Sequence, residues 1–251
     1  MTTMTFEQWR TRRRATALGI ARAQGLEIVA DDVGLLFTCA PPGVGRAGFG
    51  TSIGAEGAAR LIALIERGRR PLVVSCIDAP DDVDEGLRRV DFVEENPDAV
   101  VGMGHADISA IVRPAMVDGL RAHPASGTPD VPLDAVFELG RRHDPTYPLD
   151  DTELQPVFPT LVDATLLLTD ASGSPVATAS YRVSEGSAAI MNVVVATDWR
   201  GRGVGTLVTA SALTAARDRG ARDAVLAATA AGQPIYRRLG FTDVCRLRSF
   251  G

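Results

Sequence analysis

The sequence predicts a mixed α/β chain built around a partly antiparallel sheet. Short apolar runs typical of buried strands alternate along the chain with longer helical segments that end at glycine. The order strand, glycine-rich loop, helix, strand, helix, strand occurs twice, which predicts two copies of one unit. For a chain of 251 residues we therefore expect a first domain at 1–104 and a second domain at 105–251.

The first half opens with a helix predicted over 5–24, where Trp9, Ala17 and Ile20 recur at near-helical spacing before Gly25. Further elements follow from apolar runs and from their glycine and proline boundaries. They are strands at 34–39, 71–76 and 98–102, a glycine-rich loop at 43–50, a helix ending at Gly68, and a helix at 84–93.

The second half begins with a proline-rich and acidic segment, 121–160, that contains one helical patch at 133–142. Such segments are often surface elements or lids over a site. Strands predicted at 161–169 and 176–183 are joined by a turn at 170–174, which is a hairpin signal. A strand at 190–196 then leads through a second glycine-rich turn into a helix at 206–219.

Alignment of the two glycine-rich segments places Gly48–Thr51 opposite Gly203–Thr206. With the loop lengths that this requires, Gly45 stands opposite Arg200 and Leu87 stands opposite Tyr236.

Composition and charge exclude several classes of function. The net charge is −5, and all 26 basic residues are arginine, so the chain has neither a lysine Schiff base nor a P-loop. Because acidic residues outnumber basic ones, nucleic acid is not expected as a partner. The three cysteines are far apart and predict reduced, buried thiols without a metal site. With no signal peptide and no apolar run of membrane-spanning length, we expect a soluble cytoplasmic protein.

The turn between the strand at 190–196 and the following helix has the composition of an anion-binding loop. It presents several backbone N–H groups at the positive end of the helix dipole. Gly203 and Gly205 have no Cβ, so we expect a pyrophosphate to approach the main chain there. Arg200 and Arg202 are placed to add charge-assisted hydrogen bonds.

In its context this turn resembles a known motif. Asn192–Gly205 resembles the acetyl-CoA-binding motif of the GNAT superfamily of N-acyltransferases, Arg/Gln-x-x-Gly-x-Gly/Ala. Gly232–Phe241 resembles the motif that follows it in the family, in which a tyrosine precedes a Gly-Phe pair by four residues. The resemblance covers about 105–251 and, weakly, 30–104. It implies a GNAT fold in the second domain and a truncated GNAT-like unit in the first.

The resemblance also assigns roles to residues. The main chain of Val193, Val194 and Val195 would pair with the pantetheine arm, and one N–H would polarise the thioester carbonyl. The residues that would bind the pyrophosphate are Arg200, Gly201, Arg202, Gly203, Val204, Gly205 and Thr206.

The candidate catalytic residues are Tyr236 and Asn192. Tyr236 matches the family's tyrosine and would protonate the departing thiolate, a role that suits a phenol with a pKa near 10. Asn192 stands where family members often carry a glutamate base. Asp163 and Glu185 are alternative bases that nothing in the sequence supports. The first half lacks a matching tyrosine, so we expect it to act as a packing partner or as a wall of the substrate site.

The predicted function is therefore transfer of an acetyl or related acyl group from CoA to the amine of a small molecule. Acetyl-CoA or another acyl-CoA is the co-substrate, no metal and no membrane are involved, and a homodimer is compatible with the sequence. Proteins of this fold with other activities remain as alternatives. These are transfer from a longer acyl-CoA or an aminoacyl-tRNA, decarboxylation of an acyl-CoA, and a non-catalytic acyl-CoA sensor.

Two further patterns are weaker. Gly43–Gly48 satisfies the dinucleotide fingerprint, but Pro41-Pro42 separates it from the preceding strand, so we interpret it as a loop. Gly50–Gly54 satisfies the nucleophile-elbow pattern around Ser52, but without a strand directly before it. The three histidines, which could serve such a hydrolase, are expected in solvated loops.

Overall fold

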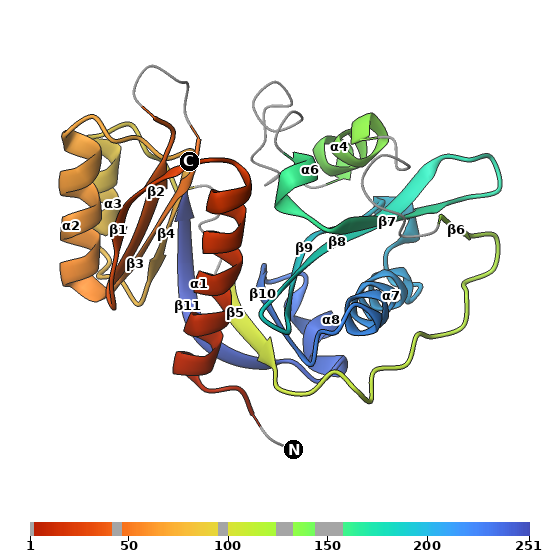
Figure 1. Cartoon of the computed structure of the whole chain (residues 1–251). Helices are drawn as coiled ribbons and strands as arrows, with labels where there is room; N and C mark the ends of the chain where they lie inside the picture. The colour runs from red at the N-terminus through yellow and green to blue at the C-terminus, as the bar shows by residue number, and fades with distance from the viewer. Residues whose placement is uncertain (1–2, 42–46, 95–99, 124–132, 144–157) are drawn as a thin grey trace.

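A computed structural model describes residues 3–41, 47–94, 100–123, 133–143 and 158–251 of the chain. The described strands form one open sheet in the order β1-β2-β3-β4-β11-β5-β10-β9-β8-β7-β6 (Figure 1). Parallel and antiparallel pairs both occur in it, which confirms the predicted mixed α/β class. None of the helices in the described ranges has the length and apolar character needed to cross a bilayer.

The elements of the first half follow one another closely along the chain. They are α1 (Phe6–Ala23), β1 (Glu27–Asp31), β2 (Leu35–Cys39), β3 (Phe49–Ile53), α2 (Gly54–Glu66), β4 (Val73–Ile77), α3 (Val83–Arg88) and β5 (Val100–His105). The second half consists of β6 (Arg121–His123), α4 (Leu133–His143), α6 (Phe158–Leu161), β7 (Ala164–Thr169), β8 (Pro175–Ser184), β9 (Ser187–Val195), a 3₁₀ turn (Thr197–Trp199), α7 (Val204–Asp218), β10 (Asp223–Ala228), α8 (Gln233–Arg238) and β11 (Thr242–Phe250).

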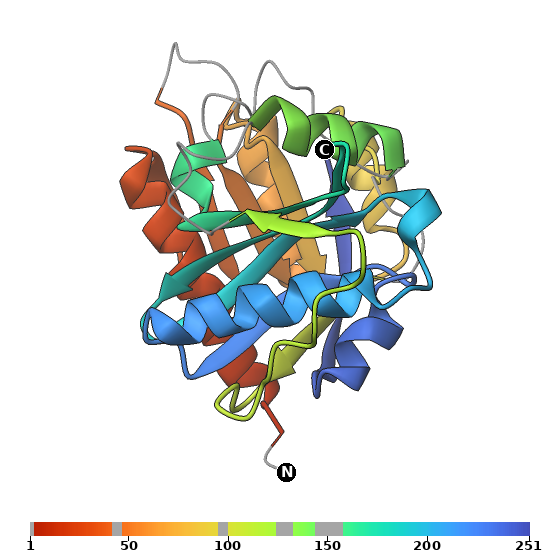
Figure 2. The ribbon, with the colours of Figure 1, turned by 90° about the vertical axis from the view of Figure 1, so that its right-hand side faces the viewer.

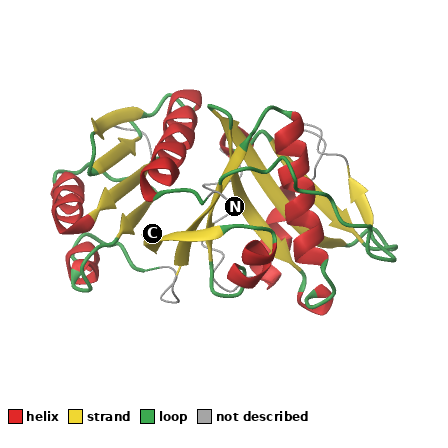
Figure 3. Cartoon of the chain, turned by 90° about the horizontal axis from the view of Figure 1, so that it is seen from below, coloured by secondary structure: helices red, strands yellow, loops and turns green. Residues whose placement is uncertain are grey.

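Strands β1–β4 lie between α2 and α3 on the outer side and α1 on the inner side (Figure 3). Burial alternates along β3 and β4, as expected for strands with two different faces. Ser52 and Cys76 are buried beneath α2 with Leu61 and Phe37. The residues between them are mostly half-buried and face α1.

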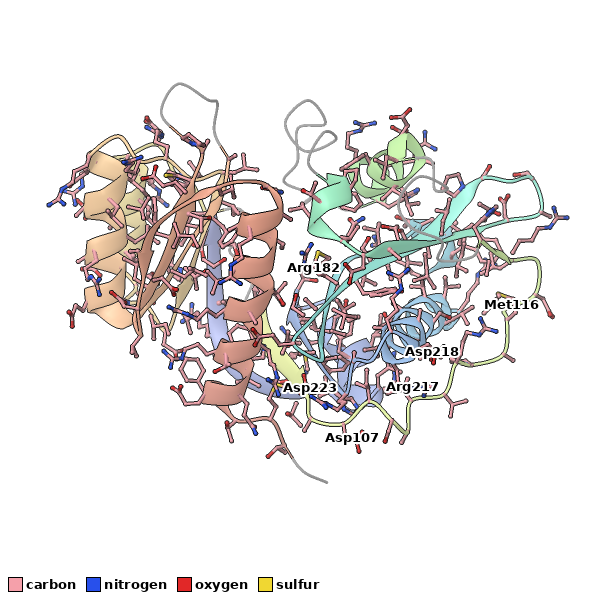
Figure 4. The ribbon with its side chains drawn as sticks, in the orientation of Figure 1. Asp107, Met116, Arg182, Arg217, Asp218 and Asp223 are labelled. Carbon is pink, nitrogen blue, oxygen red and sulfur yellow. The ribbon has the colours of Figure 1, made fainter. Side chains whose placement is uncertain are left out.

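Helix α1 confirms the predicted first helix, and it packs against strands of the second half. It begins with a capping box in which Thr5 accepts the N–H of Gln8. Trp9 is buried, and its Nε1–H donates to the carbonyl oxygen of Met103 at 3.1 Å. An ion pair between Arg12 and Asp223 (labelled in Figure 4), 3.0 Å long, fixes the helix to β10. The first helix of the chain is thus part of both halves.

The two halves contain the same succession of elements. Helix α2, β4 and α3 begin at 54, 73 and 83, and α7, β10 and α8 begin at 204, 223 and 233, which is an offset of 150 in each case (204 − 54, 223 − 73, 233 − 83). The predicted alignment of the two glycine-rich segments is therefore wrong. Gly48–Thr51 leads into and lies within β3, whereas Gly203–Thr206 lies at a helix start. At the constant offset, Gly86 is the counterpart of Tyr236.

Two strands join the halves at the centre of the sheet. β5 runs antiparallel between β10 and β11, and β11 runs antiparallel between β4 and β5. Each half thus has a strand of the other half inserted beside its own parallel pair. The sheet continues across residues 104 and 105, where the domain boundary is expected, and this boundary stays a prediction.

In the second half, α7 lies across one face of β7–β9 (Figure 2). Its buried face, which includes Leu207, Val208 and Leu213, forms the largest apolar cluster with the strands beneath it. Helix α4 packs on β8 and β9 and α1 on β8 to β11, on the other face of the sheet. The predicted hairpin is confirmed as β7 and β8, joined by the turn after Thr169.

Candidate functional site

Strands β9 and β10 pair over a short distance and then diverge. The ladder joins Ser187–Ala189 to Asp223–Val225, after which β9 continues to Val195 and β10 to Ala228. Beyond the ladder, backbone N–H and C=O groups of the two strands face the space between them instead of each other. Such groups bind an extended ligand as a further strand. We call the region between the unpaired parts of the two strands the slot.

A β-bulge in β9 lies beside this slot. Ser180 pairs with Met191 and Thr178 with Val194, so one residue of β8 faces both Asn192 and Val193. Asn192 has φ +52°, a left-handed conformation that asparagine adopts more readily than most other residues. A bulge bends its strand and increases the local twist. The left-handed conformation at the bulge therefore explains why an asparagine occupies position 192.

The turn from β9 into α7 follows the unpaired part of β9. Gly201 has φ +74° and Gly203 has φ +80°, and a Cβ added to either would have no atom within 4 Å. Gly203 is the N-cap of α7 and provides no side-chain cap. Because the first N–H groups of a helix lack intrahelical partners, this end of α7 has the polarity and the space for a phosphate.

Gly205 has a different role from the one predicted. A Cβ at this position would lie 2.7 Å from Cδ1 of Ile235 and 3.7 Å from Cγ2 of Val195. The missing side chain therefore allows α8 to pack closely against α7 and β9, and it does not face open space. Val204 is also buried, and Thr206 is half-buried.

The two arginines of the turn bind protein groups. The Nε–H of Arg200 donates to the carbonyl oxygen of Val195 at 3.2 Å, and its Nη2 donates to the carbonyl oxygen of His143. Arg202 lies over the ring of Trp199, with 5.2 Å between Cζ and the ring centroid. Both side chains are exposed, so these contacts shape the turn and leave its arginines at the surface.

Helix α4 supports the turn from the other side. The N–H of Thr197 donates to Nδ1 of His143 at 3.2 Å. Leu139 of α4 packs with Val194, Ala196 and Trp199. The expectation that His143 lies in a solvated loop is therefore wrong, because it ends α4 and anchors the turn. His105 ends β5 and His123 lies in β6, so neither lies in a loop.

Tyr236 lies in α8 with only 7% of its surface exposed. Its ring packs on Gly232, where an added Cβ would lie 2.8 Å from Cε2, and meets the ring of Phe241 edge-on with the centroids 6.0 Å apart. Burial raises the pKa of Tyr236 to about 12, above the value near 10 expected from the sequence. The phenol is therefore protonated throughout the neutral range.

The alternative bases lie near the paired end of β9. Asp163 accepts the N–H of Val183 at 2.7 Å, and Val183 pairs with Ala188. Glu185 lies in the turn between β8 and β9. Among the described residues, histidine, cysteine and carboxylate side chains form no group of three that could hold a metal ion.

Ser52 does not form a nucleophile elbow. It lies within β3, is fully buried, and its Oγ–H donates to Sγ of Cys76 at 3.3 Å. Cys39 and Cys76 are buried free thiols, as predicted, whereas Cys245 is only partly buried. The dinucleotide-like pattern at 43–48 falls largely outside the described residues.

Comparison with known proteins identifies a family match in the second half of the chain. Residues 134–241 match the model of the Acetyltransferase (GNAT) family, a segment that contains β9, the turn, α7, β10 and α8. The match to this family therefore covers residues 134–241, within the second half of the chain. This part of the chain has the GNAT fold. No curated protein matches the chain.

Solved structures share the fold over most of the chain. A GCN5-related N-acetyltransferase from Kribbella flavida superimposes with a TM-score of 0.60 at 19% identity, covering 96% of this chain and 94% of the other. One from Sphaerobacter thermophilus gives 0.54 at 17% identity, covering 96% and 90%. A tandem GNAT protein from the clavulanic acid biosynthesis pathway gives 0.54 at 16% identity, covering 87% and 78%.

Proposed function

We propose that this protein is an N-acyltransferase that moves an acetyl or related acyl group from CoA to the amine of a small molecule. The divergence of β9 and β10 beside an uncapped helix start is the observation that carries the proposal. The unpaired strand groups would bind the pantetheine arm, and the positive helix end would bind the diphosphate. In a GNAT domain this arrangement serves acyl-CoA.

Binding follows from the backbone. The N–H and C=O groups of Val193, Val194 and Val195 pair with the amides of pantetheine, as an added strand would. The N–H groups from Gly201 to Thr206 hold the diphosphate, with Arg200 and Arg202 at the rim of the turn. The bulge at Asn192 turns one N–H of β9 toward the thioester carbonyl, where it stabilises the oxyanion.

Transfer takes place within a complex of both substrates. The lone pair of the neutral amine forms a bond to the thioester carbon, and the carbonyl electrons move to the oxygen to give a tetrahedral oxyanion. When the oxyanion collapses, the C–S bond breaks and the thiolate takes the phenolic proton of Tyr236. Tyr236 is protonated at neutral pH and therefore holds a proton for this step. The ammonium proton passes to water, and Tyr236 regains its proton from solvent.

The first half serves this reaction without binding CoA itself. β3 and β4 pair along their whole length, Phe49–Ile53 with Val73–Ile77, so no slot opens between them. The counterpart of Tyr236 is a glycine, Gly86. We take the chain as a tandem of two related units, of which only the second is catalytic.

Calorimetry with acetyl-CoA, followed by CoA-release assays with a panel of primary amines, tests the proposal. We expect binding of one acetyl-CoA per chain and steady release of free CoA that depends on the amine. Binding without turnover of any amine would instead support an acyl-CoA sensor. Absence of binding by the folded protein would refute both functions.

A further inference from the structure

A cavity of about 250 Å³ lies between α1 and the inner face of the first half's strands. Alternate residues of β3 and β4 form its floor, namely Phe49, Thr51, Ile53, Val73, Ser75 and Ile77. Thr51 and Ser75 are paired neighbours, so two hydroxyl-bearing residues lie at the centre of an apolar surface. Small-molecule pockets measure roughly 300–1,000 Å³, so a ligand the size of an amino acid suits this one.

The opposite wall of the cavity is one face of α1. Trp9, Arg13, Ala17 and Ile20 lie along it at helical spacing and all line the cavity. A cationic side chain therefore interrupts an otherwise apolar stripe. Arg13 lies over the ring of Trp9, with 5.7 Å between Cζ and the centroid. Burial lowers the pKa of Arg13, because the charged form is poorly solvated at this position.

Arg13 differs from its two neighbours in the cavity wall. Arg10 pairs with Glu7 at 2.6 Å, and Arg14 pairs with Asp31. Within the described ranges of the chain, no hydrogen bond or ion pair is formed by the Arg13 guanidinium.

Cys245, the group that interacts electrostatically with Arg13, does not supply a counter-charge. Burial raises the pKa of its thiol to about 12, so the thiol is neutral at pH 7. Arg13 is partly buried, and a charge withdrawn from water is costly unless it is paired. Thr51 and Ser75, which line the same cavity, add only neutral hydrogen-bonding groups. The cavity therefore offers a cation and apolar walls to a ligand that carries one negative charge.

Met191 is the residue of the cavity wall that lies next to the proposed acyl-transfer site in the sequence. This residue of β9 lines the cavity and directly precedes Asn192 in the bulge, so their Cα atoms are about 3.8 Å apart. Arg182 of β8, which lies between α1 and α6 in Figure 4, binds the carbonyl oxygen of Thr160 at 2.7 Å. Two residues of the second half, Met191 and Leu247, thus line the cavity together with residues of the first half.

We propose that this cavity binds the acyl acceptor, and that the acceptor is a primary amine that also carries a carboxylate, which Arg13 binds. The inference rests on the proposed acyl transfer and names the substrate class for it. The carboxylate forms charge-assisted hydrogen bonds with the guanidinium, while an apolar stem packs on the floor of β3 and β4. The amine then points past Met191 toward the thioester carbon at the bulge.

Matched acceptors test the substrate class. Leucine is compared with 3-methylbutylamine, and 5-aminopentanoate with pentylamine, in CoA-release assays with acetyl-CoA and the full chain. We expect kcat/KM for at least one amino acid to exceed that of its neutral partner by about tenfold or more. Arg13→Met should reduce this preference to near unity, and Arg13→Lys should retain part of it. Arg22→Met, a change on an exposed position of the same helix, should leave it intact.

Fluorescence provides a readout that does not need turnover. The chain has two tryptophans, one in the cavity wall and one in the turn before α7. In a Trp199→Phe background, Trp9 alone reports on the cavity, and we expect leucine or 5-aminopentanoate to change its emission saturably. The neutral amines should not, and adding Arg13→Met should abolish the response.

The two proposals fail in different ways. Turnover of neutral amines with no carboxylate preference, or a preference that survives Arg13→Met, would overturn the acceptor class and leave acyl transfer standing. A carboxylate-dependent response of Trp9 without turnover of any amine would support the anion site and refute catalysis. No response of Trp9 to either amino acid, together with no preference in turnover, would overturn the inference.

Discussion

Gly203→Ala is the substitution that most sharply separates coenzyme binding from stability. Gly203 has φ +80°, and an added Cβ would meet no atom within 4 Å. Its cost to folding is therefore backbone strain alone, about 1–2 kcal/mol for an L-residue in the left-handed region. For a domain of this size that lowers the melting temperature by roughly 2–4 °C per kcal/mol.

The effect on acetyl-CoA binding has a separate origin. The added methyl group extends into the space that the diphosphate would occupy, and relief of the strain would turn the first N–H groups of α7 away from it. A hydrogen bond to a charged group contributes about 1.5–3 kcal/mol. Loss of one such bond corresponds to roughly a tenfold weaker affinity or more.

Gly220→Ala is the matched control. Gly220 follows the other end of α7, has φ +94°, and also has open space around its Cβ position. Both variants should lose similar stability in urea denaturation, but only Gly203→Ala should weaken acetyl-CoA binding in calorimetry. An affinity equal to that of the wild type in Gly203→Ala, with the expected loss of stability, would refute the placement of the diphosphate at this turn.

Three other changes give distinct outcomes. Tyr236→Phe should lower kcat by about tenfold or more while acetyl-CoA affinity holds, and an unchanged kcat would remove the acid role. Leu139→Ala should lower the free energy of unfolding by about 2–5 kcal/mol because Leu139 is buried beneath the turn, and it should weaken CoA binding as well. His105→Gln should reduce the loss of unfolding free energy that occurs as the pH falls into the acid range. Burial lowers the pKa of His105 in the folded state, so stability is fully present above about pH 6.5 and is lost as pH falls below it. If urea denaturation at a series of pH values showed the same pH dependence of the unfolding free energy in the variant as in the wild type, this prediction would be contradicted.

The elements with strong local signals could be predicted from the sequence. The helical spacing that begins at Trp9 and the hairpin turn around Gly173 both predicted elements that the structure contains. The glycines of the second half placed the start of α7 correctly, because Gly203 supplies the left-handed conformation that precedes the helix. The helix predicted at 84–93 is shorter in the structure, ending at Arg88.

What could not be predicted depends on contacts between distant residues. Strand β11 lies between β4 and β5. The local sequence of a strand does not indicate which other strands it will pair with, so this position could not be predicted. The packing role of Gly205 could be recognised only from the position of Ile235 in the structure. The role of His143 could be recognised only from the contact between α4 and the turn. Arg13 was visible within the apolar spacing of α1, but its lack of an ion pair with another described residue appears only once the helix is docked.

A crystal structure of the full chain with coenzyme A tests the central claim most directly. The account predicts the diphosphate against the N–H groups between Gly201 and Thr206, and pantetheine hydrogen-bonded along Val193–Val195 in the slot beside β10. Coenzyme A bound elsewhere, for instance over β3 and β4 of the first half, with the β9–β10 slot empty, would contradict it.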